Sequence, residues 1–281
     1  MDTHVLRAVL VIGCLLLSGC TSGGGLPETA PDATPTGIPT PSIAVRFTQT
    51  DVFCPTANEK ALRAYNAAQD AEETGSLDKA ESLYRDAIEH DPHFCDAMDN
   101  LGVLLRRQGR IDEAIGWYRR SLAVFPANTV AQQNIALALM VQGDYLSAAK
   151  EYQQLIEMAP DNPEGHFGLA NAYLVMEQPE RAIECLETAQ DLYAALGDEP
   201  HLIDVRFALG TANFHQGEYD AARRYLLAVY PRLGEEPGVN YYLGLCYLTE
   251  ESYDLEQARH YLGVAQSLGV ELPAPVRAMI E

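Results

Sequence analysis

Lysine is scarce in this chain of 281 residues, which contains only Lys60, Lys79 and Lys150. Lysine and arginine together number 19, against 40 acidic residues, so the formal net charge is −21. A surface of this charge repels the phosphates of nucleic acids and of anionic lipid headgroups. We therefore expect no nucleic-acid partner and no electrostatic docking to a membrane, and lysine-based chemistry has few candidates.

The sequence also lacks the short motifs that mark common enzyme classes. It has no GxxxxGK[ST] loop, no GxSxG elbow, no HExxH pair and no GxGxxG turn. His90, His93 and Cys95 lie close together around a turn, where a metal site can be imagined, but no second group of ligands supports them. We therefore expect neither an enzyme nor a bound metal or other cofactor.

A long apolar run is missing as well, because the one near the N-terminus, residues 8–17, is too short to cross a hydrocarbon core of about 30 Å. Such a run is typical of a signal peptide. Leu-Ser-Gly-Cys then ends at Cys20 and resembles the lipobox of bacterial lipoproteins. The resemblance implies removal of residues 1–19 and acylation of Cys20, with two or three acyl chains such as palmitate as a durable anchor. The alternative is a plain signal peptide.

Residues 20–52 are rich in glycine, threonine and proline, with prolines at 27, 31, 35, 39 and 41. Such a composition cannot bury enough apolar surface to fold. We expect a flexible tether, which at about 3 Å per residue could reach on the order of 90 Å. Together with the lipobox, it predicts an exported protein anchored to a bacterial membrane, either the outer membrane or the outer face of the cytoplasmic membrane.

From about residue 58 the chain repeats with a period of 34 residues. Four positions carry the period: Gly75, Gly109 and Gly143; Ala80, Ala114 and Ala148; Tyr84, Tyr118 and Tyr152; and Pro92, Pro126 and Pro160. This pattern resembles the tetratricopeptide repeat (TPR) family. The resemblance implies an all-α fold, a right-handed superhelical solenoid of about six pairs of antiparallel helices.

The repeat domain is expected to span residues 53–272, followed by a tail at 273–281 that is too short for a full capping helix. The expected repeats lie near residues 61–94, 95–128, 129–162, 163–202, 203–236 and 237–272. The fourth repeat departs from the pattern, because Glu177 stands where glycine is expected and the second helix is longer.

Four cysteines remain after Cys20, and export places them in an oxidising space where disulfides persist. Cys54 lies just before the first repeat, and Cys95 opens the second. A disulfide between them requires the N-terminal segment to fold back, and free thiols are the alternative. Cys185 and Cys246 are expected to be small buried hydrophobic residues.

In the TPR family, the first helix of each repeat faces a concave channel with its positions 2, 5, 6, 9 and 12. The resemblance implies a partner-binding groove built from Asn66, Asn100, Asn134, Tyr65, Gln69, Asp99, Phe167, Asn171, Phe207 and Tyr241. Asparagine can pair with any peptide backbone, aromatic rings offer a face to apolar or cationic side chains, and carboxylates favour a basic partner. The alternative is that the asparagines and aromatic residues serve only the packing of the repeats.

These features predict a lipid-anchored scaffold that binds another envelope protein, or an extended basic or apolar peptide segment, in the groove. The layout is similar to that of the six-repeat lipoproteins that help to assemble type IV pilus secretins, and of repeat lipoproteins that assist barrel insertion or regulate cell-wall synthases. The alternative is a lipoprotein that captures a small solute or a glycan, for which aromatic stacking faces are suited.

Overall fold

The computed structural model describes residues 54–249 and 253–281. The predicted signal peptide, the lipidated Cys20 and the tether lie outside the described residues. The described part contains thirteen helices and no strand, in agreement with the predicted all-α class. No helix of these residues combines the length and the apolar character needed to cross a membrane.

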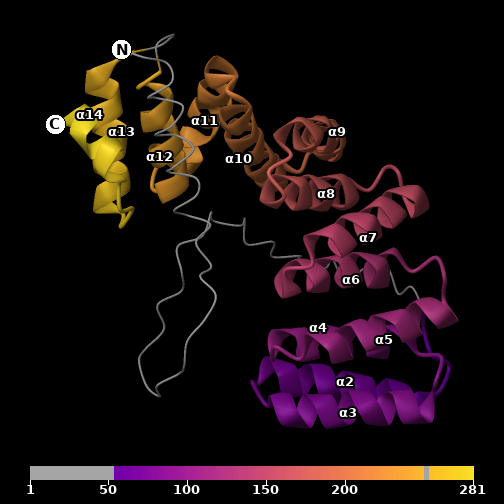
Figure 1. Ribbon diagram of the computed structural model, residues 1–281. Coiled ribbons are helices and arrows are strands. Elements are labelled where there is room, and N and C mark those ends of the chain that lie inside the picture. Colours follow the sequence, from indigo (N-terminus) through magenta and orange to yellow (C-terminus); the bar gives the residue numbers. More distant parts are fainter. Residues whose placement is uncertain (1–53, 250–252) are drawn as a thin grey trace, which may run out of the picture. The chain divides into compact units, whose positions relative to one another are not determined.

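The described chain forms two compact units, which divide between Asp198 and Glu199. The N-terminal unit, residues 54–198, contains eight helices (Figure 1): α2 (Glu59–Glu73), α3 (Leu77–His90), α4 (Cys95–Arg107), α5 (Ile111–Val124), α6 (Thr129–Gln142), α7 (Tyr145–Met158), α8 (Pro163–Val175) and α9 (Pro179–Leu196). The C-terminal unit contains five: α10 (Glu199–Gln216), α11 (Tyr219–Leu233), α12 (Pro237–Cys246), α13 (Leu255–Ser267) and α14 (Ala274–Ile280).

Within each unit, consecutive helices pack as pairs, α2 with α3, α4 with α5 and so on to α12 with α13. Small residues allow this close packing, because Ala80, Ala114 and Ala148 are completely buried at equivalent places in the second helices. The repeated tyrosines Tyr84 and Tyr118 are also fully buried and fill the space between the helices. The alanine and tyrosine positions that recur every 34 residues are therefore positions of the hydrophobic core.

The turn inside each pair requires a left-handed backbone. Gly75, Gly109 and Gly143 follow the first helices with φ angles of 73°, 79° and 84°, which glycine adopts without a steric penalty. Glu177 takes the equivalent place in the fourth pair with φ of 57° and is the one positive-φ residue other than glycine in the described chain. The departure from the sequence pattern thus leaves the turn unchanged.

The boundary between the fourth and fifth pairs differs from the prediction. α9 is long, with 18 residues against 14 in α7, but it ends at Leu196, where Gly197 adopts a left-handed φ of 68°. α10 therefore begins at Glu199 rather than near residue 203, and the extra length is shared between both helices.

The C-terminal tail forms the short helix α14, which packs against α13. Val276 is buried there, and the guanidinium of Arg259 on α13 donates to the carbonyl groups of Ile280 and Glu281. The tail, predicted to be too short for a full cap, thus contributes a single helix of seven residues to the last pair.

Candidate functional site

The first helices α2, α4, α6 and α8 carry the predicted groove residues of the N-terminal unit. Tyr65, Asn66 and Gln69 lie on α2, Asp99 and Asn100 on α4, Asn134 on α6, and Phe167 and Asn171 on α8. We call the surface marked by Tyr65, Asn66, Gln69, Asn100, Asn134 and Asn171 the first-helix face. The remaining two predicted residues, Phe207 on α10 and Tyr241 on α12, belong to the C-terminal unit and are described with it.

Tyr65 connects the first two repeats on the first-helix face. Its hydroxyl oxygen accepts hydrogen bonds from Asn100 Nδ2 at 2.7 Å and from Gln69 Nε2 at 3.2 Å, and its ring packs 5.0 Å from that of Phe94. Burial, together with the nearby charge of Asp96, raises the pKa of Tyr65 to about 12, so the phenol is neutral at physiological pH. The predicted residues of α2 and α4 therefore form one hydrogen-bonded group.

The three asparagines at position 6 have different surroundings. Asn66 is exposed, Asn100 is bound to Tyr65, and Asn134 is 3% exposed. The Nδ2 groups of Asn134 and of Asn171 are buried and have no hydrogen-bond partner among the described residues. A buried donor without an acceptor costs about 1–3 kcal/mol. An added acceptor at either of these two amides, which lie on adjacent first helices, would remove this cost; Arg106 Nε on α4 is a further buried donor without a partner among the described residues.

Three of the four aromatic residues at position 5 are buried. Phe167, Phe207 and Tyr241 are 2%, 9% and 7% exposed. Phe167 meets Tyr193 edge to face, with ring centroids 6.5 Å apart, and Phe207 and Tyr241 lie in the hydrophobic core of the C-terminal unit. These rings are large and apolar, so burying them between helices is favourable. In this structure they contribute to packing and do not offer a stacking face.

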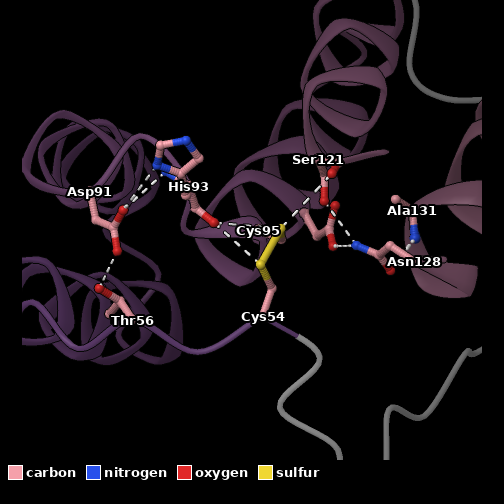
Figure 2. The surroundings of a disulfide bond; sticks show 9 residues. Cys54, Thr56, Asp91, His93, Cys95, Ser121, Asn128 and Ala131 are labelled. Atoms are coloured by element: carbon pink, nitrogen blue, oxygen red, sulfur yellow. Dashed lines mark hydrogen bonds and ion pairs between the residues drawn. A yellow bond between two sulfur atoms is a disulfide. The ribbon is translucent and has the colours of Figure 1, made fainter. Parts of the chain in front are cut away.

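Asp99 is also buried and does not present its charge to the face. Its Oδ2 accepts a hydrogen bond from Asn128 Nδ2 at 2.7 Å. The same amide donates to Ser121 Oγ at 2.9 Å, and Figure 2 shows Asn128 and Ser121 side by side. Burial raises the pKa of Asp99 to about 7, against the hydrogen bonds from Asn128 and Ser121, which lower it. Asp99 therefore joins α4 to the start of α6, because Asn128 caps that helix.

The raised pKa of Asp99 predicts a pH-dependent stability. Between about pH 4 and pH 7 the folded state keeps a proton that the unfolded state has released, so the free energy of unfolding falls as the pH rises. Asp99→Asn removes this loss. The free energy of unfolding of the variant minus that of the wild type is therefore expected to rise by on the order of 2 kcal/mol from pH 5 to pH 8. Urea unfolding at both pH values measures the difference, and Asp70→Asn, at an exposed position of α2, is the control. Equal shifts in the two variants would contradict the assignment.

Cys54 and Cys95 are joined by a disulfide, with Cα atoms 5.3 Å apart (Figure 2). The bond occupies the sulfur of Cys95, so this residue offers no thiolate for a metal site with His90 and His93. His93 points to solvent, and the described residues contain no group of three or more His, Cys, Asp or Glu placed to hold a metal ion. Cys185 is half-buried and Cys246 is buried, and burial raises the pKa of both thiols.

Apolar residues of the first-helix face were missing from the predicted set. Val103 on α4, Val130 and Met140 on α6, and Leu174 on α8 are each partly exposed. Val103 occupies position 9 of its repeat, Val130 position 2, and both Met140 and Leu174 position 12. The helical offsets used to select the polar residues would therefore also have found these apolar ones. The face is therefore mixed, with amide groups beside partly exposed aliphatic side chains.

Two family models, both described as tetratricopeptide repeat, match the chain. One matches residues 65–129 and 167–237, and the other residues 139–192. No curated protein matches the sequence.

Solved structures give a consistent comparison at the level of the fold. PilF from Pseudomonas aeruginosa is 20% identical, with a TM-score of 0.63, over 76% of this chain and 94% of that chain. YrrB, described as a TPR protein with an unusual peptide-binding site, is 20% identical, with a TM-score of 0.56, over 70% and 95%. MamA from Desulfovibrio magneticus RS-1 is 21% identical, with a TM-score of 0.56, over 64% and 99%.

Proposed function

The chain belongs to the tetratricopeptide repeat family, and from this premise we propose that it is a lipid-anchored scaffold of the bacterial envelope. In this proposal, Cys20 carries the acyl chains, residues 21–52 form the tether, and the first-helix face binds an extended segment of another envelope protein. The lipobox and the similarity in layout to lipoproteins that assist secretin assembly support a role in building an envelope complex of the type IV pilus or secretion type.

One observation carries the binding proposal: Asn134 and Asn171, on adjacent first helices, hold buried amide donors for which the described residues supply no acceptor. A carboxamide of this kind recognises the carbonyl groups of a peptide backbone whatever the side chains are. The partly exposed Val103, Val130 and Met140 beside them suit apolar side chains of the same segment. With a net charge of −21, the protein attracts a basic partner and speeds its encounter.

The alternative function, capture of a small solute or a glycan, depended on aromatic faces for stacking. Phe167, Phe207 and Tyr241 are buried in the packing of their own units. We therefore retain the peptide-binding proposal and treat a glycan adduct as an outcome of the test.

Photo-crosslinking in cells tests the scaffold. A benzoylphenylalanine probe replaces the exposed Asn66 on α2, and a matched control replaces Leu146, which is 62% exposed on the second helix α7. We expect one dominant protein adduct at position 66 and none at position 146. In the same cells, Cys20→Ala should abolish palmitate labelling and release the protein from the membrane. A glycan adduct, no protein adduct, or equal adducts at both positions would reject the proposal.

A second variant separates binding from folding. Asn134→Leu replaces the unpartnered amide with an apolar group of similar size, so the free energy of unfolding should be unchanged or higher. Partner capture, measured as the yield of the position-66 adduct, should fall at least tenfold. If stability and capture fall together, Asn134 serves the fold and not the partner.

A further inference from the structure

Arg106 is the one basic residue at the five groove positions of the first helices α2, α4, α6 and α8. It occupies position 12 of α4, and its side chain is partly exposed. Its Nε, however, is buried and has no hydrogen-bond partner among the described residues. In a protein with a net charge of −21, this guanidinium is a local exception that needs an acceptor.

The second repeat differs from the first at one pair of equivalent positions. In the first repeat, the hydroxyl of Tyr84 donates to Glu72 Oε2 at 2.6 Å. One period later the corresponding residues are Tyr118 and Arg106, so a cation stands where the first repeat has its acceptor. The Tyr118 hydroxyl is buried and has no hydrogen-bond partner in the described part of the chain. The second repeat therefore has the donor but lacks the carboxylate that would accept from it.

The guanidinium of Arg106 lies close to this hydroxyl. A Cβ atom at Gly102 on α4 would lie 2.4 Å from Tyr118 Cε1 and 2.7 Å from its Cζ, so the tip of the ring reaches Gly102. Arg106 follows Gly102 by four residues and therefore shares its side of α4. Burial raises the pKa of Tyr118 to about 12, whereas the charge of Arg106 lowers it, which agrees with the proximity of the two side chains.

Asn134 adds a third donor to this pair. On α8, a Cβ atom at Gly168 would lie 2.3 Å from Tyr152 Cζ, so the tyrosine of one repeat reaches position 6 of the next first helix. One repeat earlier, the same two positions are occupied by Tyr118 and Asn134. The repeat therefore places beside Tyr118 the buried Nδ2 of Asn134, which has no partner among the described residues. We call Arg106, Tyr118 and Asn134 the donor cluster.

The nearby carboxylate of Asp99 does not satisfy the donor cluster. Its charge is close enough to raise the pKa of Tyr118, but its Oδ2 accepts from Asn128. Its Oδ1 has no hydrogen-bond partner among the described residues, so it accepts from none of the three donors. Burial raises the pKa of Asp99 to about 7, so part of this carboxyl is uncharged at neutral pH. The donor cluster therefore lacks an acceptor within the described chain.

We propose that the donor cluster binds one carboxylate of a partner, supplied by an aspartate or glutamate side chain of a segment that lies along the first-helix face. The inference rests on the proposed function, because Asn134 belongs to the same face. The two oxygens of a carboxylate accept charge-assisted hydrogen bonds from a guanidinium, and their remaining lone pairs accept from a hydroxyl and an amide. The partner thereby supplies to the second repeat the acceptor that Glu72 supplies to the first.

The position of the donor cluster favours a side chain over a chain end. The first-helix face continues on both sides of it, to Tyr65 on α2 and to Asn171 on α8. An extended segment that contacts both of these groups runs past the donor cluster, so only a side chain can place its carboxylate there. A partner that is basic overall then carries one acidic residue at this point, which restricts the sequences that the face accepts.

Titration with small carboxylates tests the donor cluster without a partner. The arginine Nε–H signals of the full-length, oxidised protein are recorded by NMR, and the signal of Arg106 is identified by its loss in Arg106→Gln. The N-methylamide of N-acetyl-aspartate, which carries a side-chain carboxylate, should shift this signal saturably, and the neutral asparagine analogue should not. The exposed Arg107, which pairs with Glu72 at 3.0 Å, is the internal control.

Two results of this titration would count against the inference. No shift at Arg106, or equal shifts at Arg106 and Arg107, would overturn it. A stronger effect of N-acetyl-alanine, which carries a terminal carboxylate, would reject the assignment to a side chain.

Tyr118→Phe separates binding from folding. It removes a hydroxyl that has no partner among the described residues, so the melting temperature should stay the same or rise. The dissociation constant of the aspartate probe should increase by at least about threefold, because one hydrogen bond to the carboxylate is lost. An unchanged constant would show that the carboxylate does not bind at the donor cluster.

The partner gives the final readout in cells. Arg106→Gln should lower the yield of the position-66 adduct by at least about tenfold, and Arg107→Gln should leave it unchanged. Equal yields in the two variants would refute the inference and leave the scaffold proposal standing. Carboxylate binding at Arg106 without any adduct at position 66 would instead reject the scaffold proposal.

Discussion

Cys54→Ser is expected to lower the free energy of unfolding of the N-terminal unit by about 4 kcal/mol relative to the oxidised wild type. The disulfide joins residues 41 apart in sequence. Closing a loop of this length removes chain entropy from the unfolded state, which corresponds to about 4 kcal/mol at 25 °C. The bond also holds Thr56 and Asn58 against the α3–α4 turn, so these contacts weaken with it.

The measurement is equilibrium unfolding in urea followed by tryptophan fluorescence. Trp117 is the only tryptophan and lies on α5, with the guanidinium of Arg120 4.2 Å from its ring, so its emission reports on the N-terminal unit alone. Cys185→Ser, at a half-buried free thiol on α9, is the matched control and should change the stability much less. A loss below about 1 kcal/mol for Cys54→Ser would mean that the unfolded state gains little freedom when the bond is absent.

The repeating part of the fold could be predicted from the sequence because local rules determine it. A left-handed turn favours glycine, and a close helix pair favours alanine, so Gly109 and Ala114 mark a turn and a buried contact wherever the period places them. The same rules fail at Leu196 and Glu199. There, α9 and α10 each have 18 residues, and the left-handed Gly197 marks the end of α9.

The candidate site could be predicted only as a set of helical positions. The offsets identify which side of a first helix a residue occupies, but the depth of burial depends on neighbours that are distant in sequence. Phe167 is covered in this way by Tyr193 of α9, and Asp99 by Asn128. Asn66 and Asn134 share one position in the repeat, yet Asn66 is exposed, whereas Asn134 is buried and its Nδ2 finds no partner in the described part of the chain. Period alone cannot make that distinction.

Gly168→Ala is expected to destabilise the N-terminal unit by about 2 kcal/mol, although it adds a single methyl group to a helix. Gly168 lies on α8 directly against the ring of Tyr152 on α7, and a Cβ atom there would overlap three atoms of that ring. Tyr152 is 3% exposed, so its ring has no free space into which it can move. Overpacking of this kind commonly costs 1–3 kcal/mol, and it outweighs the roughly 1 kcal/mol that alanine gains over glycine in a helix.

Gly116→Ala supplies the control for the same substitution without the overlap. Gly116 lies on α5 in the same unit, is exposed, and has no atom within 4 Å of the position that a Cβ would take. Alanine there should raise the free energy of unfolding by up to about 1 kcal/mol. The two variants should therefore move the Trp117 unfolding curve in opposite directions. If Gly168→Ala also stabilises the protein, the helices α7 and α8 do not approach as closely as the position of Tyr152 requires.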